Sequence, residues 1–80
     1  MARGLMKKTH IFNDSVTIPD FFTRGWVTNT HASANITITS SEGTLTLEPD
    51  EVVEWNYAEE GYAQIVVDKG SGSVKGYYIM

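Results

Sequence analysis

Cysteine is absent from the 80-residue sequence, so neither a disulfide nor a thiolate metal site can stabilise the fold. Long apolar runs are absent as well, and the first residues lack the continuous apolar stretch of a secretion signal. No run is long enough to cross a bilayer. The sequence therefore predicts a cytoplasmic protein with no membrane partner.

The short chain limits the size of the core. Its 80 residues suffice for one domain and not for two, with hydrophobic residues at 41% and charged residues at 20%, as in ordinary globular proteins. A domain of this size buries only about 60% of the surface of its unfolded chain. Since no disulfide can compensate, we expect a homo-oligomer, in which contacts between subunits supply further stability.

Basic residues are scarce and unevenly distributed. The net charge of −4 has the wrong sign for neutralising phosphates, which argues against nucleic acid as a partner. No Lys or Arg occurs between Arg24 and Lys69. The acidic residues within that interval are Glu42, Glu48, Asp50, Glu51, Glu54, Glu59, Glu60 and Asp68. The middle of the chain is therefore expected to form an acidic surface.

Residues 1–8 form a basic segment, called here the N-terminal arm. Its charge comes from Arg3, Lys7 and Lys8, and its apolar contact surface from Leu5 and Met6. Because opposite potentials orient association, the arm is predicted to dock on an acidic neighbouring subunit. The alternative is a solvated tail attached to a solvated acidic surface.

Period-two alternation of apolar and polar residues is the strongest pattern in the chain. It predicts a β-hairpin formed by residues 34–39 and 44–47. Further strands are predicted at 51–57, 62–68 and 73–80, of which 62–68 is the most continuously apolar and is therefore expected at the centre of a sheet. From the hairpin onward we expect an antiparallel meander.

The first third of the chain carries shorter strand signals. Strands are predicted at 9–12, 15–18 and 25–30, with a loop or one helical turn at 19–25. The total of seven or eight short strands indicates an all-β protein, namely a small antiparallel β-sandwich or barrel over residues 9–80, with almost no helix.

Catalytic and metal chemistry have little support. His10 and His31 are the side chains that titrate near neutral pH, and neither lies in a recognisable motif, so we expect no enzyme and no cofactor. The two histidines are 21 residues apart, which does not suit zinc. The carboxylates of 50–51 and 59–60 could gather at one end of adjacent strands and bind calcium, but a solvated acidic rim is the favoured interpretation.

Aromatic residues are numerous, nine in all. Trp55 is predicted to fill the core with its same-face neighbours Val53 and Tyr57, and Trp26 is predicted to do so with one of the phenylalanines at 21–22. The alternative is that Trp26 and Trp55 form an exposed platform for a ligand such as a sugar ring.

The last strand ends the printed sequence. Tyr77 and Tyr78 are adjacent in it and point to opposite faces, so at least one of them should lie outside the core. The strand is predicted to lie near an interface with a partner, to which it contributes Tyr77, Tyr78, Ile79 and Met80.

Within residues 35–72, Ile-Thr-Ile-Thr is followed by Gly-Thr-Leu-Thr-Leu-Glu-Pro-Asp-Glu-Val-Val-Glu-Trp. This stretch, about half of the chain, resembles the threonine-rich, turn-dense strands of small bacteriophage virion proteins, such as capsid decoration and head or tail accessory subunits. The resemblance implies a non-enzymatic subunit that binds a symmetric lattice in many copies through an arm and sheet edges. Carbohydrate-binding and adhesin domains contain similar strands.

The expected function is therefore that of a structural assembly protein located in a virion that is assembled in the host cytoplasm. Its expected partners are other virion or capsid proteins and further copies of itself. The alternative is a small β-sandwich module that binds carbohydrate through exposed aromatic residues. A nucleic-acid-binding barrel would need a basic groove beside those aromatics, and the middle of the chain carries no Lys or Arg.

Overall fold

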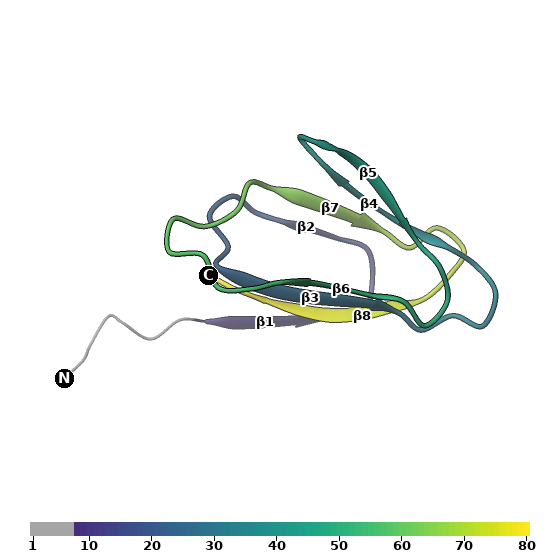
Figure 1. Cartoon of the computed structure of the whole chain (residues 1–80). Coiled ribbons are helices and arrows are strands. Elements are labelled where there is room, and N and C mark those ends of the chain that lie inside the picture. Colours follow the sequence, from purple (N-terminus) through teal and green to yellow (C-terminus); the bar gives the residue numbers. More distant parts are fainter. Residues whose placement is uncertain (1–7) are drawn as a thin grey trace.

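The structure is a computed structural model that describes residues 8–80. Eight strands and no helix occur in this part of the chain (Figure 1). They are β1 (Thr9–Phe12), β2 (Val16–Ile18), β3 (Arg24–Asn29), β4 (Ile36–Ser40), β5 (Gly43–Leu47), β6 (Val52–Trp55), β7 (Ile65–Asp68) and β8 (Val74–Ile79). They form two antiparallel sheets packed face to face, so the predicted all-β sandwich is confirmed.

The two sheets are wound together. Sheet 1 has the strand order β1-β8-β3-β6, and sheet 2 has the order β2-β7-β4-β5. Four antiparallel pairs, β1 with β8, β2 with β7, β3 with β6 and β4 with β5, join the first half of the chain to the second as in one long hairpin. This hairpin is rolled up so that β8 also pairs with β3 and β7 with β4. The connectivity is that of a jelly roll.

The predicted meander is wrong. Only the β4–β5 hairpin pairs consecutive strands; β6 crosses to sheet 1, β7 returns to sheet 2 and β8 lies again in sheet 1. Alternation of side chains indicates that a segment is a strand, but it carries no information on which distant strand is its partner. The central position of β7 is confirmed, since it lies between β2 and β4.

Two strands are shorter than predicted. β6 ends at Trp55 and β7 begins only at Ile65. Between them the Tyr62 hydroxyl donates to the carbonyl of Asn56. The Ala58 N–H donates to the carbonyl of Thr23 over 3.0 Å, so the chain after Trp55 no longer continues the regular pairing of β6 with β3. Tyr57, predicted to be buried, is 56% exposed for this reason.

The core is built differently by the two sheets. Its buried apolar residues are Ile18, Ile36, Ile38, Leu47, Ile65 and Val67 from sheet 2, Val27 and Val74 from sheet 1, and Phe22 from the loop before β3. Sheet 1 adds the half-buried rings of Phe12, Trp55 and Tyr78. Room for these rings comes from glycine, because a Cβ at Gly76 would overlap the Trp26 carbonyl and lie 2.8 Å from Phe12 Cζ.

Asn29 is the buried polar side chain that ties the sheets together. It lies at the end of β3 in sheet 1 and is 1% exposed. Its Nδ2 donates to the carbonyls of Ala34 at 2.8 Å and Leu47 at 2.9 Å, and its Oδ1 accepts the N–H of His31 at 2.9 Å. Because these hydrogen bonds satisfy the buried amide, it stabilises one relative position of the sheets.

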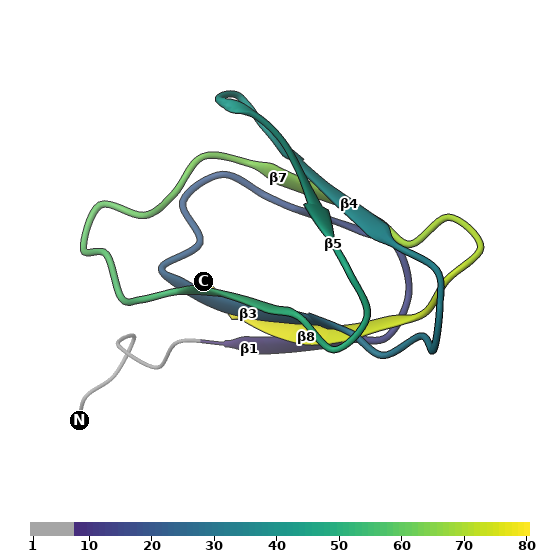
Figure 2. The same ribbon diagram turned by 45° about the vertical axis from the view of Figure 1, so that its right-hand side comes forward.

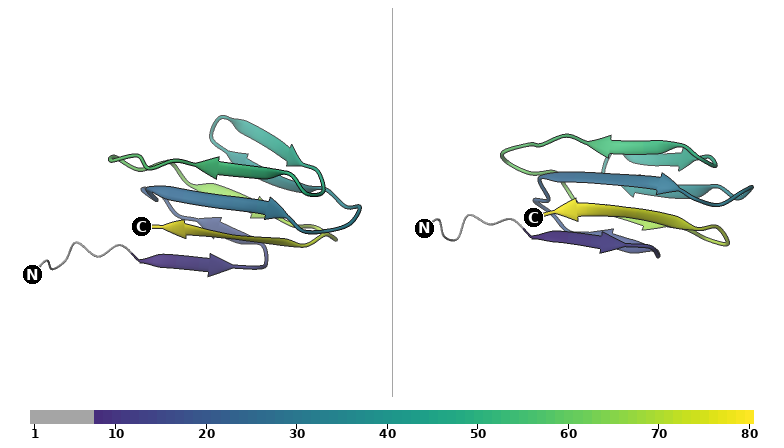
Figure 3. Two further views of the ribbon diagram at one scale, coloured as in Figure 1. Left: turned by 60° about the horizontal axis from the view of Figure 1, so that its bottom comes forward. Right: turned by 90° about the horizontal axis from the view of Figure 1, so that it is seen from below.

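The two sides of the sandwich differ in shape. β1 and β2 are the edge strands on one side, and β6 and β5 are the edge strands on the other (Figure 3). On the second side the sheets diverge toward the tip of the β4–β5 hairpin, which rises away from sheet 1 (Figure 2). This divergence leaves the inner face of β5 incompletely covered.

Candidate functional site

The outer face of sheet 1 carries an apolar row. Strand register places Ile11, Tyr77, Trp26 and Glu54 side by side across the four strands. Ile11 is 83% exposed. The rings of Trp26 and Tyr77 are nearly parallel, with an interplanar angle of 22° and centroids 6.2 Å apart. The apolar side chains of this set, Ile11, Tyr77 and Trp26, together with half-buried Ile79, are called the apolar row below.

The outer face of sheet 2 has the opposite character. Its strands point threonine hydroxyls to solvent, at Thr17, Thr37, Thr39, Thr44 and Thr46. The hydroxyls of Thr39 and Thr44 lie 3.3 Å apart across the hairpin. A hydroxyl face of this kind is well hydrated, whereas contiguous exposed apolar surface marks a site of interaction. The apolar row is therefore the better candidate for a binding surface.

The terminal strand is placed by the structure at the centre of sheet 1. β8 lies between β1 and β3, so its backbone is paired on both sides and its edge is not free. Tyr77 and Ile79 face outward. Tyr78 faces the core and stacks on His10, with centroids 4.7 Å apart and the planes at 12°. Any contact made by this strand therefore uses its outward side chains, as expected for one tyrosine of the pair.

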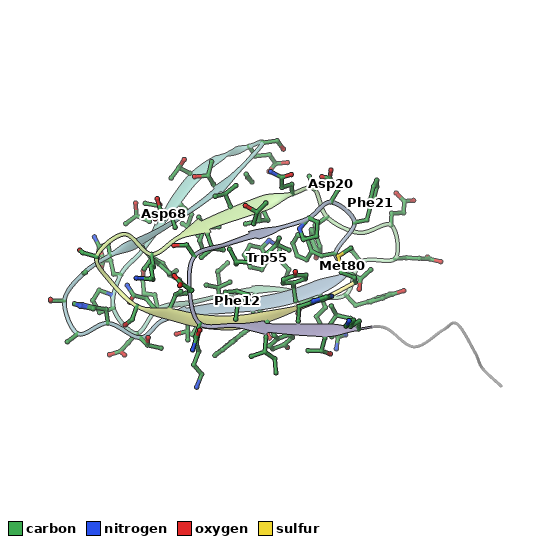
Figure 4. The ribbon with its side chains drawn as sticks, turned by 180° about the vertical axis from the view of Figure 1, so that it is seen from behind. Phe12, Asp20, Phe21, Trp55, Asp68 and Met80 are labelled. Carbon is green, nitrogen blue, oxygen red and sulfur yellow. The ribbon has the colours of Figure 1, made fainter. Side chains whose placement is uncertain are left out.

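The two tryptophans lie on opposite faces of sheet 1. Gly25, next to Trp26, is the register partner of Trp55, and alternation sends the two indoles in opposite directions. Trp55 packs with Val53 against the core, as predicted, and Figure 4 shows it between the sheets. The prediction that Trp26 fills the core with a neighbouring phenylalanine is wrong, since Trp26 stacks on Tyr77 instead. Trp26 and Trp55 cannot share one platform.

A second apolar surface lies at the diverging edge of the sandwich. It is a cavity of about 320 Å³, called here the β5–β6 cleft. Its lining comes from both sheets and consists of Ile38, Ser40, Glu42, Gly43, Thr44, Leu45, Val53, Trp55 and Ile65. Leu45 faces inward from β5, yet it is 48% exposed because this cavity separates it from Val53 and Trp55 of β6.

Charge is segregated between the two sides of the molecule. Residues 36–60, which form β4, β5, β6 and the following turn, contain no Lys or Arg. Their acidic residues are Glu42, Glu48, Asp50, Glu51, Glu54, Glu59 and Glu60, all exposed. The basic residues that the structure describes are Lys8, Arg24, Lys69 and Lys75, which belong to other parts of the fold. The predicted acidic surface thus coincides with the side that holds the β5–β6 cleft.

The predicted arm lies mostly outside the described residues. Arg3, Leu5, Met6 and Lys7 belong to the residues that the structure does not describe. Lys8 is exposed and immediately precedes β1, and its carbonyl accepts the N–H of Met80 over 3.2 Å. The chain therefore enters the fold at the β1 side, away from the β5–β6 cleft.

The histidines have structural partners. Nδ1 of His31 accepts the backbone N–H groups of Ser33 at 3.0 Å and Ala34 at 2.9 Å, and so closes the loop before β4. Within residues 8–80, no group of three or more His, Cys, Asp or Glu side chains is placed to hold a metal. The carboxylates at 50–51 and 59–60 precede and follow β6, so they do not gather at one end of this strand, and the arrangement considered for calcium is not formed there.

Phe21, one of the two phenylalanines predicted as candidates to pack in the core with Trp26, is an exposed surface residue instead. It is 72% exposed, has φ of 74° and points away from the sandwich (Figure 4). Its N–H donates to the carbonyl of Tyr62 over 2.7 Å, which fixes the turn. The neighbouring Phe22 is fully buried, and a pair of adjacent aromatics entering a strand is the signal that one of them must face outward.

The fold and its surfaces define an eight-stranded jelly roll with an apolar row on one outer face and an acidic, open edge. In comparisons with known proteins, no family model matches the chain, and no curated protein or solved structure matches it either. No helix that is long and apolar enough to cross a membrane occurs among residues 8–80. The surfaces themselves therefore carry the argument about function.

Proposed function

We propose that the protein is a non-enzymatic structural assembly subunit, a virion accessory subunit of the capsid decoration or head or tail type. It binds other virion proteins and further copies of itself. The observation that carries the proposal is the apolar row on sheet 1, where Ile11 is 83% exposed beside the stacked rings of Trp26 and Tyr77. Aromatic side chains centred on an otherwise flat sheet face are typical of protein interfaces.

The small size of the domain supports the same proposal. A sandwich of 80 residues without disulfides has a limited core, and burial of the apolar row against another protein would add to its stability. Jelly rolls recur in viral capsid proteins and in lectins, but this is an analogy at the level of fold, and a fold hosts many functions.

The direct test is occupancy of particles. Particles from the source culture are banded on a density gradient, and the copy number of the chain is measured by quantitative mass spectrometry. We expect the chain at particle density in many copies, in a fixed ratio to the major structural protein. Its absence from every particle band would overturn the assignment to a virion.

A matched pair of variants tests the surface. Ile11→Lys changes the apolar row on edge strand β1, and Thr17→Lys makes the same charge change on edge strand β2 in the hydroxyl face of sheet 2. Particle occupancy should fall by about tenfold or more for Ile11→Lys and stay unchanged for Thr17→Lys. Equal occupancy for the two variants would remove the apolar row from the proposal.

Carbohydrate binding is the second candidate, favoured by one observation. Trp26 and Tyr77 present nearly parallel rings on an open sheet face, with Lys75 and Glu54 close by in the register. Such rings can stack on the apolar faces of sugars. Binding to a glycan array, lost in Trp26→Ala and retained in Val66→Ala on the other sheet, would favour this candidate. A monomer that binds no particle would favour it further.

A further inference from the structure

The free edge of β5 is an unfilled strand position. β5 is the last strand of sheet 2, and all its residues except Leu47 are exposed. An edge strand presents unpaired N–H and C=O groups that can accept a further strand, unless charge, proline or a bulge prevents it. Residues 43–47 contain no charge and no proline. Sheet 2 can therefore be extended at β5.

The β5–β6 cleft lies directly beside this edge. An added strand gains affinity from backbone hydrogen bonds and specificity from side chains that enter neighbouring pockets. Here the pocket is the cavity of about 320 Å³ between Leu45 of β5 and Val53 and Trp55 of β6. One or two medium-sized apolar side chains fit a space of that size, and they would cover Leu45, which is 48% exposed.

The charge around the cleft selects a basic occupant. Glu42 lines the cleft itself, and the adjoining β5–β6 connection carries Glu48, Asp50 and Glu51. Residues 36–60 provide no cation to balance them. The N-terminal arm combines Leu5 and Met6 with three basic residues, and it therefore matches the cleft in both hydrophobicity and charge.

The arm of the same chain cannot reach this cleft. Leu5 precedes Thr9, the first residue of β1, by four residues, so an extended chain carries it at most about 14 Å from β1. β1 and β6 are at opposite edges of sheet 1, three strand spacings or about 14 Å apart. β5 lies in the other sheet, a layer spacing of about 10 Å away in the perpendicular direction, so the straight distance from β1 to β5 is about 17 Å and exceeds the reach of Leu5. An arm bound in this cleft therefore comes from a second copy.

We propose that the β5–β6 cleft binds the arm of a second copy of this chain, with Leu5 and Met6 in the cleft and the backbone added along β5. The inference rests on the proposed function as an assembly subunit and specifies how the copies join. β1, which follows the arm in the sequence, and β5 lie on opposite sides of the sandwich (Figure 3). The contact is therefore heterologous, and it produces rings or filaments rather than a closed face-to-face dimer.

Two variants of the full chain remove the two halves of the contact. Leu5→Ser with Met6→Ser removes the apolar donor side chains without changing charge, and Ala2→Ser with Gly4→Ser is its control. Leu45→Lys blocks the acceptor, and Thr46→Lys places the same charge on the opposite face of β5, outside the cleft. Circular dichroism establishes that each variant keeps the wild-type fold.

Sedimentation velocity from micromolar to submillimolar protein measures association. The wild type and both control variants should form species larger than a dimer, and high salt should weaken them because the arm is basic and the cleft acidic. The arm variant Leu5→Ser/Met6→Ser and the cleft variant Leu45→Lys should each weaken association by about tenfold or more. If neither of these two variants differs from its control, the proposal fails.

Mixing the two variants gives the sharpest result. The Leu5→Ser/Met6→Ser chain keeps an intact cleft, and the Leu45→Lys chain keeps an intact arm. An equimolar mixture should therefore form a heterodimer and grow no further, because only one productive contact remains. A mixture that stays monomeric while the wild type associates overturns the arm-in-cleft contact, and particle occupancy then decides the proposed function independently.

Discussion

Sheet 2 lines the core with aliphatic side chains, whereas sheet 1 lines it largely with aromatic rings that lie over glycine. The inward residues of sheet 2 include Ile36, Ile38 and Val67, each nearly fully buried. In sheet 1, Phe12 covers Gly76, and Trp55 lies over Gly25 together with Phe22 from the loop before β3. Aliphatic strands fill the core by volume alone, while the aromatic sheet depends on the absence of a Cβ atom at Gly76 and, to a smaller degree, at Gly25.

The outer faces differ in the same way. Sheet 2 presents threonine hydroxyls to solvent, and sheet 1 presents the apolar row. Sheet 2 thus has one apolar face, which the core already buries. Its remaining potential for binding a partner lies at the free edge of β5. Sheet 1 has an apolar inner face and, in addition, an apolar row on its outer face, which is the surface that a partner would cover.

The largest expected effect is at Gly76. The substitution Gly76→Val forces a side chain onto the Trp26 carbonyl and the Phe12 ring, and we expect a loss of more than about 4 kcal/mol in the free energy of unfolding. A domain of this size has about 4–12 kcal/mol in total. Urea denaturation, monitored by tryptophan fluorescence, measures the loss in the free energy of unfolding.

Gly25 sharpens that prediction. A Cβ there would lie 3.3 Å from both Phe22 Cε2 and Trp55 Cε3, which small shifts can relieve, so Gly25→Ala should cost only about 1 kcal/mol. Equal losses for Gly76→Val and Gly25→Ala would show that ring placement over Gly76 is not what makes sheet 1 sensitive.

The next effect is in the aliphatic sheet. Ile36 is 1% exposed, and Ile36→Ala should lower the free energy of unfolding by about 3–4 kcal/mol, through lost transfer energy and the cavity left behind. Phe12→Ala, which removes a half-buried ring at edge strand β1, should cost about 2 kcal/mol despite its larger volume change. The same urea experiment compares them, and the reverse ranking would contradict the assignment of the main core to sheet 2.

The third effect tests the connection between the sheets. Asn29→Leu leaves the buried carbonyls of Ala34 and Leu47 without their donor, and we expect a loss of about 2–3 kcal/mol in the free energy of unfolding. Asn35→Leu is the control, because Asn35 is exposed, and its effect should stay within about 0.5 kcal/mol. Hydrogen exchange should show faster opening near β5 in Asn29→Leu alone.

The smallest effect on stability concerns the outer faces. Ile11→Thr places a hydroxyl in the apolar row, and Thr17→Ile places an apolar side chain on the hydroxyl face of sheet 2. Both positions are exposed on edge strands, so each substitution should change the free energy of unfolding by less than about 0.5 kcal/mol. Solubility in ammonium sulfate should rise for Ile11→Thr and fall for Thr17→Ile, because each variant changes the exposed apolar area. A large stability change for Ile11→Thr would indicate that the row serves the fold rather than binding.

The candidate surfaces were only partly visible in the sequence. The outward position of Tyr77 follows from alternation along the last strand, and the acidic interval predicts an acidic surface. Trp26 was wrongly assigned to the core because alternation does not say which face of a two-faced apolar strand is inside. Ile11 was not identified as a surface residue, since its exposure depends on which face of β1 packs against sheet 2.

The β5–β6 cleft depends on contacts that no local pattern encodes. Leu45 alternates with threonines as a core residue would, yet it is half exposed because the hairpin rises away from sheet 1 and leaves a cavity beneath it. The strength of an alternation signal reports which residues share a face, and it does not report how far the opposite sheet extends over that face.

The sequence by itself determined the all-β class, eight strand segments to within a few residues, the β4–β5 hairpin and the separation of charge, because these depend on side-chain period, turn residues and composition within short windows. Only the tertiary structure decided the jelly-roll pairing of β1 with β8 and β2 with β7, the opposite faces of Trp26 and Trp55, and the open cleft. Those features arise from burying distant segments against one another. Their free energy belongs to the assembled core rather than to any one strand.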